Sequence, residues 1–330
     1  MSSSKITIKE VAKQAGVSIA TVSRFLNNFS LKKINKQNVE NAIAKLNYHP
    51  FIYARRLAGG QMGVFGLIIP GYEGVFYSFY AIEIIREVAL ALNEQDTDLH
   101  LSVFWNRDTF KTSIVDGIIM ADILGNQQQF KRFLKEKIPL VVINRNIGEE
   151  NVNSVAIDNF KGAYDATEFL INHGHKQIMH FAGDLRVQCA SERLMGFQSA
   201  LEKNNIKASK QQVKYTNFSR RQTRLILEEL FSSGDIPTAI FCCSDEVASE
   251  VLNFAEEKRI NIPKKLSVIG FDDNPHCLND HLMLTTVRQP LKKMVQQAVK
   301  VLSDNVNGKK IQQKIVLEPE FIIRDTVSFC

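Results

Sequence analysis

The sequence predicts an α/β protein that carries a small all-helical domain at its N-terminus. Short amphipathic helix patterns fill the first 50 residues, whereas apolar strands alternate with amphipathic helices from Val64 onward. The charge divides near the same place. Residues 1–60 hold ten Lys and Arg against two Glu, a balance of +8, whereas the other residues hold 31 basic and 33 acidic side chains. We therefore expect two differently built parts in this chain of 330 residues.

The N-terminal part begins with two short helix patterns in TIKEVAKQAGVSIATVSRFLNN, residues 7–28. Apolar side chains recur at helical spacing on both sides of a glycine: Ile8, Val11, Ala12 and Ala15, then Val17, Val22, Phe25 and Leu26. Thr7 followed by Glu10 is typical of a capping box, and Ser18 is a suitable N-cap for the second helix. Gly16 permits a tight turn between them. We expect two amphipathic helices that pack against each other.

The second helix keeps a polar face once its apolar stripe is buried. That face carries short side chains and one guanidinium: Ser18, Ile19, Ala20, Thr21, Ser23, Arg24 and Asn27. Small side chains allow close approach to a DNA major groove, and Arg24 could donate to O6 and N7 of one guanine. The alternative is the solvated face of a small helical bundle. The basic excess of the first 60 residues favours a polyanionic partner over that alternative.

A third helix is expected within NKQNVENAIAKLNYHP, residues 35–50, where the proline at position 50 ends it. The next residues, FIYARRLAGGQMG, run from a short basic helical stretch at Tyr53–Ala58 into the paired glycines Gly59 and Gly60. Paired glycines commonly mark a connection between structured units. The expected division is a helical domain at 1–50, a hinge helix and linker at 51–61, and an α/β core at 62–330.

The core is predicted as a series of strands, most of them followed by a helix. The strands are short apolar runs: VFGLIIP, LHLSVF, VDGIIM, PLVVIN, SVAID, QIMHFAG, TAIFCCS, LSVIGFDD and LTTVRQP. Such alternation predicts doubly wound parallel sheets, and the core is long enough for two of them. Ligands of open α/β sheets bind at the carboxyl ends of the strands. Polar residues stand at these ends: Asn144, Arg145, Ser244, Asp245, Asp272, Asp273 and Gln289.

Several other classes of protein fit this sequence poorly. It contains no run of 18 or more apolar residues and no secretory hydrophobic region after Met1, so we expect a cytoplasmic protein without a membrane partner. The five cysteines include no C-x-x-C pair, and Cys242 and Cys243 fit as small buried side chains of an apolar strand. His173-Gly-His175 is typical of a helix end, since no further ligand lies at metal-site spacing. We expect neither a metal nor a cofactor.

A series of motifs carries a resemblance to a known family. In chain order they are AGVSIATVSRFLNN, LNYHP, A-x-x-L-A-G-G, VAIDNFKGA, Gly174-His175, ERLMGF, SVIGFDD and LTTVRQP. Together they resemble the lactose/galactose repressor family over nearly the whole chain. The resemblance implies a helix-turn-helix headgroup and a periplasmic-binding-protein-like core with two subdomains. The N-subdomain would comprise about 62–158 and 291–318, and the C-subdomain about 159–290 and 319–330.

The resemblance also implies a function. The protein would be a transcriptional repressor that binds a palindromic double-stranded DNA operator as a homodimer. It would sense a small molecule, which in this family is usually a sugar or a nucleobase, and we expect a mono- or disaccharide. The base-reading positions fall on Ile19, Ala20 and Arg24. Supporting DNA contacts fall on Thr7, Ser18, Thr21, Ser23 and Asn27. The hinge contacts fall on Tyr53, Ala54 and Leu57, and Leu57 would wedge between base steps in the minor groove.

The family's effector contacts fall on eight residues of this chain: Phe76, Phe79, Asn144, Arg193, Phe218, Ser244, Asp272 and Gln289. This set suits a polyol. Asp272 and Asn144 can accept hydrogen bonds from hydroxyl groups, and Arg193 can donate to two adjacent oxygens. The phenylalanines could stack on a pyranose ring, although at least half of them are expected to belong to the core.

The sequence departs from the family in a few places. About a dozen residues separate LHLSVF from VDGIIM, too few for a full crossover helix, which leaves the order and packing of that sheet edge open. Asn144 stands where an Asp is frequent in the family, and Phe51 stands where Asn is common. The C-terminal EFIIRDTVSFC has no leucine heptads, so a tetramer is not implied.

Two alternatives share the predicted core. An exported sugar-binding protein would need a signal peptide and would not carry the basic helical domain. A sugar-processing enzyme could use Asp272 and Asp273 as an acid/base pair, but adjacent residues of an extended segment point to opposite faces. The sequence also lacks the G-x-S-x-G and G-x-x-x-x-G-K-[ST] motifs, and no G-x-G-x-x-G follows the first strand. We therefore expect a regulator and not an enzyme.

Overall fold

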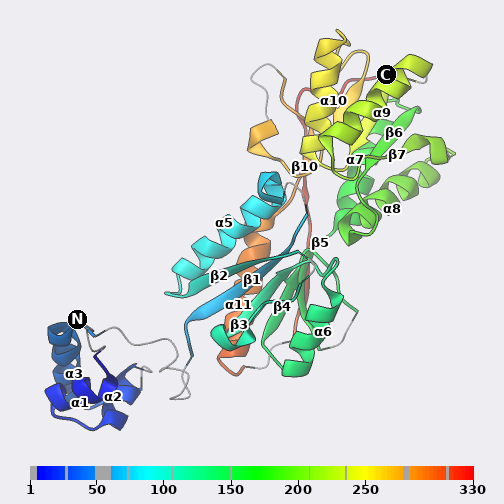
Figure 1. The fold of residues 1–330 in the computed structure, drawn as a ribbon. Helices are drawn as coiled ribbons and strands as arrows, with labels where there is room; N and C mark the ends of the chain where they lie inside the picture. Colours follow the sequence, from blue (N-terminus) through cyan, green and yellow to red (C-terminus); the bar gives the residue numbers. More distant parts are fainter. Residues whose placement is uncertain are drawn as a thin grey trace.

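The fold comprises a small helical domain and a core of two parallel sheets (Figure 1). It is seen in a computed structural model that describes residues 6–26, 29–48, 61–72, 75–105, 107–148, 151–207, 209–234, 236–277, 282–309 and 312–330. Short 3₁₀ turns connect some of the elements: η1 (Val75–Tyr77), η2 (Thr112–Ile114), η3 (Lys210–Gln212) and η4 (Pro275–Cys277). None of the helices in the described residues is long and apolar enough to cross a membrane.

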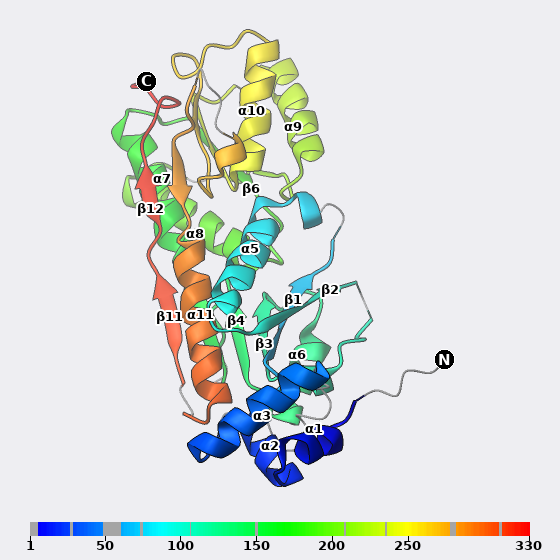
Figure 2. The ribbon, with the colours of Figure 1, turned by 90° about the vertical axis from the view of Figure 1, so that its left-hand side faces the viewer.

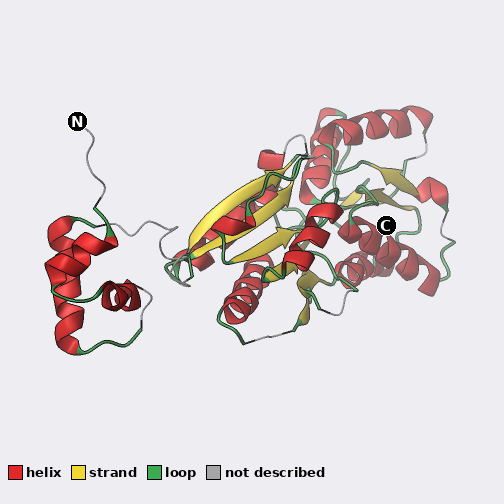
Figure 3. Ribbon diagram, turned by 60° about the horizontal axis from the view of Figure 1, so that its bottom comes forward, coloured by secondary structure: helices red, strands yellow, loops and turns green. Residues whose placement is uncertain are grey.

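The N-terminal domain packs three helices around a small apolar core (Figure 3). They are α1 (Ile8–Ala15), α2 (Ile19–Leu26) and α3 (Lys33–Leu46). Glu10 accepts a hydrogen bond from the Thr7 backbone N–H at 2.7 Å, and Gly16 adopts the left-handed conformation with φ 65°. Ser18 Oγ accepts from the Thr21 N–H at 3.1 Å. The predicted cap and turn of the two short helices are therefore confirmed.

The first sheet of the core has six strands, and every neighbouring pair is parallel. In spatial order they are β11 (Lys314–Leu317), β5 (Asn153–Ile157), β4 (Leu140–Ile143), β3 (Gly117–Ala121), β1 (Val64–Pro70) and β2 (Asp98–Phe104). Helices α5 (Phe79–Asn93) and α11 (Leu291–Val306) cover one face, and α6 (Gln127–Glu136) covers the other. Both faces are buried, as the near-continuous apolar strands require.

The second sheet is parallel and has helices on both faces. In spatial order its strands are β7 (Val213–Tyr215), β6 (Ile178–Ala182), β8 (Ala239–Cys242) and β9 (Ser267–Ile269). Helices α7 (Asn159–Asn172) and α8 (Gln188–Lys203) cover one face, and α9 (Arg220–Ser233) and α10 (Asp245–Glu257) cover the other. The predicted pair of doubly wound sheets is confirmed. Cys242 and Cys243 are buried in this core, as expected.

Three chain crossings join the two sheets within the described residues. The chain passes from β5 to α7, returns from β10 (Thr286–Arg288) to α11, and passes again from β11 to β12 (Glu320–Ile322). β10 and β12 pair antiparallel with Arg288 opposite Glu320. Figure 2 shows α11 against the first sheet, of which β11 is an edge strand, and β12 beside the second sheet. The segments around residues 158, 289–290 and 318–319 thus connect the two halves.

The short connection between β2 and β3 leaves β2 as the edge strand of the first sheet, beside β1. It contains only the turn η2, yet β2 pairs with β1 from Val64↔Asp98 to Pro70↔Phe104. Phe110 covers the sheet there in place of a helix. Its ring is 5% exposed, lies edge-on to Phe133 at 5.7 Å, and is so close to Gly66 that a Cβ on that glycine would lie 2.7 Å from it.

Phe110 therefore makes this edge of the core dependent on one ring. Phe110→Ala should leave a cavity over Gly66 and lower the free energy of unfolding by about 3–5 kcal/mol. Urea unfolding followed by circular dichroism would measure the loss. Leu225→Ala, which removes a side chain that is 52% exposed on α9, serves as the control. Equal stability of the two variants would show that Phe110 does not replace the missing helix.

Candidate functional site

One candidate interface is the outward face of α2. Ile19 is 45% exposed, Ser18, Ala20 and Arg24 are exposed, and Thr21 and Ser23 are half-buried. Arg24 makes no ion pair with any residue that the structure describes. The expected contacts Asn27, Tyr53, Ala54 and Leu57 lie outside the described residues.

Two hydroxyls of this face also shape the helix start. Ser18 Oγ lies 2.9 Å from Thr21 Oγ1 and caps the first turn of α2. Thr7 has its Oγ1 3.2 Å from the Glu10 carboxylate at the start of α1. Because the caps fix where α1 and α2 begin, they also fix the angle at which the exposed face is presented.

The second candidate site is a cavity of about 440 Å³ between the two sheets. Six of the eight expected effector contacts line it: Asn144, Arg193, Phe218, Ser244, Asp272 and Gln289. Most follow the carboxyl ends of strands, as open α/β sheets require. The other two do not line it. Phe76 is 52% exposed, and Phe79 packs at the start of α5 against the core of the first sheet.

Arg193 is held in place by neutral groups. It is 3% exposed, its Nε donates to Asn159 Oδ1 at 2.9 Å, and its Nη1 donates to the Cys243 carbonyl. The guanidinium stacks on the Phe271 ring at 3.6 Å. These contacts orient Arg193 without a bound carboxylate, which leaves its other amino group for a ligand in the cavity.

Asp272 and Gln289 form a pair on the same wall. The Gln289 amide donates to Asp272 Oδ1, and both side chains are buried. Burial and the neighbouring Asp245 raise the pKa of Asp272, and Arg193 only partly opposes them. The surroundings of Asp272 therefore disfavour the charged form of its carboxyl group.

Three buried polar atoms of the wall make no well-formed hydrogen bond within the described part of the chain, although the Tyr80 hydroxyl lies near the Asn144 side chain. They are the Tyr80 hydroxyl, Asn144 Oδ1 and Gln289 Oε1. An unsatisfied buried polar group costs about 1–3 kcal/mol, so such atoms are uncommon in native cores. Three of them around one cavity are suited to a ligand rich in hydroxyl groups.

Backbone strain gathers around the same cavity. Five non-glycine residues of its wall have positive φ angles: Asp122, Asn144, Asn217, Phe218 and Asp272. The Phe218 ring also rests on Gly183, where a Cβ would lie 2.3 Å from the ring. Residues keep such angles only where the surroundings over-determine them, and they cluster at binding sites.

Hydrogen bonds near the cavity join residues of the two halves. The Phe79 backbone N–H at the start of α5 donates to Glu246 Oε1 of α10 at 3.1 Å. Elsewhere on the rim the Asn146 N–H donates to Gln188 Oε1 at 2.8 Å, and the Gln188 amide donates back to the Asn146 carbonyl. These contacts join the two subdomains directly across the cleft.

Several cavity residues were not expected from the sequence. Asp122 directly follows β3, and Tyr72 and Asp184 each lie two residues beyond the ends of β1 and β6, so the strand-end rule could have found all three. Tyr80 and Glu246 lie in the first turns of α5 and α10 and carry no comparable signal. Of the strand-end residues that were noted, Arg145 pairs with Asp122 at 3.0 Å instead of lining the cavity.

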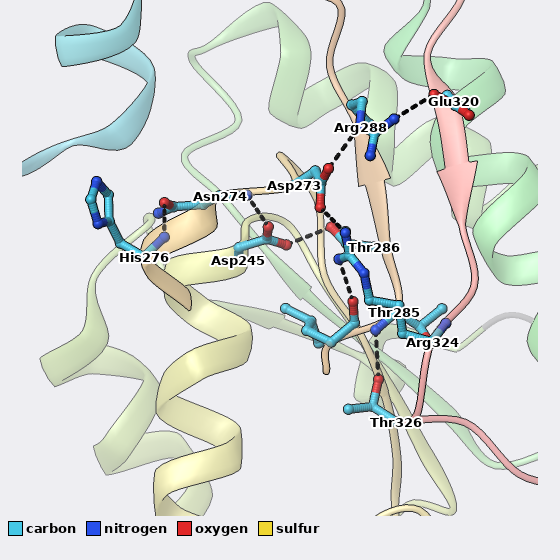
Figure 4. A network of polar contacts seen from close by, with 11 residues as sticks. Asp245, Asp273, Asn274, His276, Thr285, Thr286, Arg288, Glu320, Arg324 and Thr326 are labelled. Atoms are coloured by element: carbon cyan, nitrogen blue, oxygen red, sulfur yellow. Dashed lines mark hydrogen bonds and ion pairs between the residues drawn. The ribbon is translucent and has the colours of Figure 1, made fainter. Parts of the chain in front are cut away.

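The adjacent carboxylates Asp272 and Asp273 point in different directions. Asp272 lines the cavity, whereas Asp273 is bound to Arg288 and Arg324 (Figure 4). They do not flank one bond. Asp245 accepts from the Asn274 N–H at 2.7 Å and from Thr286 Oγ1 at 2.6 Å. Among the described residues no group of three or more His, Cys, Asp or Glu could hold a metal ion.

Comparison with known proteins finds two family models in this chain. Residues 7–50 match "Bacterial regulatory proteins, lacI family", and residues 167–327 match "Periplasmic binding protein-like domain". The probable HTH-type transcriptional repressor ExuR of Bacillus subtilis (strain 168) is 31% identical over 98% of both chains.

Solved structures share the fold over almost the whole length. The transcriptional regulator CelR in complex with cellobiose has a TM-score of 0.73 at 25% identity and covers 97% of this chain and 99% of its own. The Lac repressor dimer bound to operator and the anti-inducer ONPF has a TM-score of 0.83 at 23% identity and covers 98% and 100%.

The raised pKa of Asp272 has a consequence for the stability of the protein. A carboxyl group whose pKa is raised on folding stabilises the fold below the unfolded value of about 4 and loses that contribution as the pH rises through the folded value. The side chain of Asn does not ionise, so Asp272→Asn should not lose stability as the pH rises. We expect the variant to melt above the wild type at pH 8, with the difference shrinking towards pH 4. A difference that is constant between pH 4 and pH 8 would contradict the assignment.

Proposed function

The chain belongs to the LacI family of bacterial regulatory proteins, and we propose that it acts as a homodimeric repressor of a palindromic operator whose affinity is set by a sugar. That it is a DNA-binding transcriptional regulator follows from the family. The finer statements rest on the two candidate sites. The strongest support for a sugar effector is the set of buried polar atoms without well-formed hydrogen bonds around a cavity between the two sheets.

The exposed face of α2 supports the operator contact. Ile19 and Ala20 offer apolar contact to thymine methyl groups, and Arg24 offers the single strong donor of the face. Each half-site would then contain one firmly specified G·C pair beside A·T positions. A palindromic operator matches two such helices in a symmetric dimer. Leu57 of the linker is proposed to wedge into the minor groove at the operator centre.

The cavity supports a sugar as the effector. Its volume of about 440 Å³ lies within the range of small-molecule sites. Asn144 and Gln289 present acceptor oxygens, and Arg193 and the Tyr80 hydroxyl present donors, a mixture that matches the hydroxyl groups of a mono- or disaccharide. The neighbour CelR was solved with cellobiose, which is a disaccharide.

The same features argue against the two alternative functions. A sugar-processing enzyme would need a pair of carboxyl groups on one bond, and Asp273 is occupied by two arginines. An exported binding protein has no use for a basic helix-turn-helix domain. The protein is therefore proposed to act on DNA in the cytoplasm and to bind its sugar without turnover.

The first test concerns DNA recognition. Arg24→Ala should weaken operator binding by about 1–3 kcal/mol and relax sequence preference at one base pair of each half-site. In vitro selection of operator sequences followed by titration would show both effects. Lys264→Ala, which changes an exposed lysine in the loop between α10 and β9, is the control. An unchanged sequence preference at every position would show that Arg24 does not contact a base.

The second test concerns the effector. A thermal-shift screen of mono- and disaccharides should find a sugar that raises the melting temperature without being converted. Asp272→Ala should abolish the response of operator binding to that sugar, while operator affinity without sugar stays within about threefold of the wild type. Asp165→Ala, on the outer surface of α7, should respond normally. A normal response of the Asp272→Ala variant to the sugar would show that Asp272 is not an effector contact.

A further inference from the structure

The second carboxylate of the SVIGFDD motif has no place in the proposed sugar contacts, yet it is firmly bound. Asp273 Oδ2 accepts from Arg288 Nε at 2.7 Å, and Oδ1 accepts from Arg324 Nη2 at 2.6 Å (Figure 4). Its side chain is 12% exposed. Burial alone would raise the pKa of Asp273, but the two arginines outweigh it and lower the pKa. Asp273 therefore stays charged at neutral pH.

Both arginines lie in or beside the antiparallel strands β10 and β12, each of which adjoins a crossing between the two sheets. Arg288 ends β10, just before α11 begins, and its Nη1 donates to Glu320 Oε2 of β12 at 2.9 Å. Arg324 follows β12, and its Nη1 donates to the Leu284 carbonyl at 2.9 Å. The Asp273 carboxylate thus joins β10 and the segment after β12 to the turn that carries Asp272.

That turn is strained. Asp272 has φ 140° and Asp273 has φ 59°, two consecutive values that non-glycine residues seldom adopt. The Asp272 N–H donates to the Val287 carbonyl of β10 at 2.8 Å, and the Asn274 N–H donates to Asp245 at 2.7 Å. The ion pairs of Asp273 with the two arginines lie between these two backbone hydrogen bonds. Such a conformation persists only where several contacts enforce it.

We propose that Asp273 is a positioning residue that aims Asp272 at the effector and ties it to the crossing strands. It acts through Arg288 and Arg324, which fix the turn at 272–274 relative to β10 and β12. A sugar that moves Asp272 then also moves the segments between the subdomains. The inference rests on the proposed function, because it takes Asp272 as an effector contact.

The matched variants are Asp273→Asn and Thr326→Val. Asn keeps the shape of Asp and tolerates the left-handed conformation, so that variant removes mainly the charge. Thr326 Oγ1 accepts from the Thr285 N–H at 2.9 Å and donates to the Val268 carbonyl at 2.6 Å. Thr326→Val therefore loosens the same strands without touching Asp273.

Crystal structures of the two unliganded full-length variants provide the first readout. We expect the Asp272 carboxyl group to leave the cavity wall in Asp273→Asn and to keep its place in Thr326→Val. Should Asp273→Asn fail to fold, Arg288→Met removes one of the two pairs and should displace Asp272 as well. Glu320→Gln breaks only the outer link and should leave Asp272 in place.

Calorimetric titration with D-glucose, D-galactose, D-ribose and cellobiose provides the second readout. Any of these that binds the wild type should bind Asp273→Asn about tenfold or more weakly, and Thr326→Val within about threefold. An unmoved Asp272, or an equal loss of affinity in both variants, would overturn the proposal. If none of the four sugars binds the wild type, the choice of sugar fails, whereas the crystal structures still decide the role of Asp273.

Discussion

The facing carboxyl ends of two parallel sheets are the constraint on which the rest of this structure depends. In a parallel sheet every strand ends at the same edge, so the residues that follow the strands gather there. Asp122 and Asn144 come from the first sheet, and Asp184, Ser244 and Asp272 come from the second. The three crossings hold the two edges opposite each other. Neither half alone could form the cavity.

The polar groups of the core divide into two kinds. Asp245, Thr286 and Thr326 are satisfied by neighbours, and they secure strands whose role is structural (Figure 4). Asn144 and Gln289 keep unpartnered oxygens instead, at a cost of about 1–3 kcal/mol each. The large apolar cores on both faces of each sheet make this cost tolerable. A ligand whose hydroxyl groups donate hydrogen bonds to these oxygens would offset this cost.

Periodicity and strand ends predict much of this protein, and packing explains what they miss. The alternation from Val64 onward predicts both sheets, and the capping signals at Thr7 and Ser18 predict the ends of α1 and α2. Phe110 has no periodic signal, because it covers a sheet from a loop whose course depends on Gly66 and Phe133.

Aromatic side chains of the cavity are the hardest part of the site to predict. Phe76 and Phe79 were expected at the cavity, but Tyr72 and Tyr80 line it instead. A shift of one residue along a helix turns a side chain by about 100°, and in sequence an aromatic residue facing a cavity looks like one facing a core. The positions of Asn144, Arg193 and Asp272 are easier to predict. Asn144 and Asp272 follow strand ends, and Arg193 lies on the buried face of α8.

Helix α11 gives the cavity a rigid connection to the linker. It begins at Leu291, two residues after Gln289 of the cavity wall, and its 16 residues span about 24 Å. At its far end the Val306 carbonyl and Asn307 Oδ1 accept from the Gln61 amide at 3.3 and 3.0 Å. The Asp116 carboxylate also accepts from the N–H groups of Met62 and Gly63 at 2.8 and 2.7 Å.

The first residues after the linker are thus fixed to the first sheet and cannot move independently of it. An effector that contacts Asn144 on one side and Asp272 on the other favours one relative placement of the two sheets, because only contacts that differ between two states can shift their equilibrium. Any rotation of the first sheet then carries Gln61 with it. In the proposed dimer, the separation of the two linkers would therefore be set by the same rigid body that forms half of the cavity.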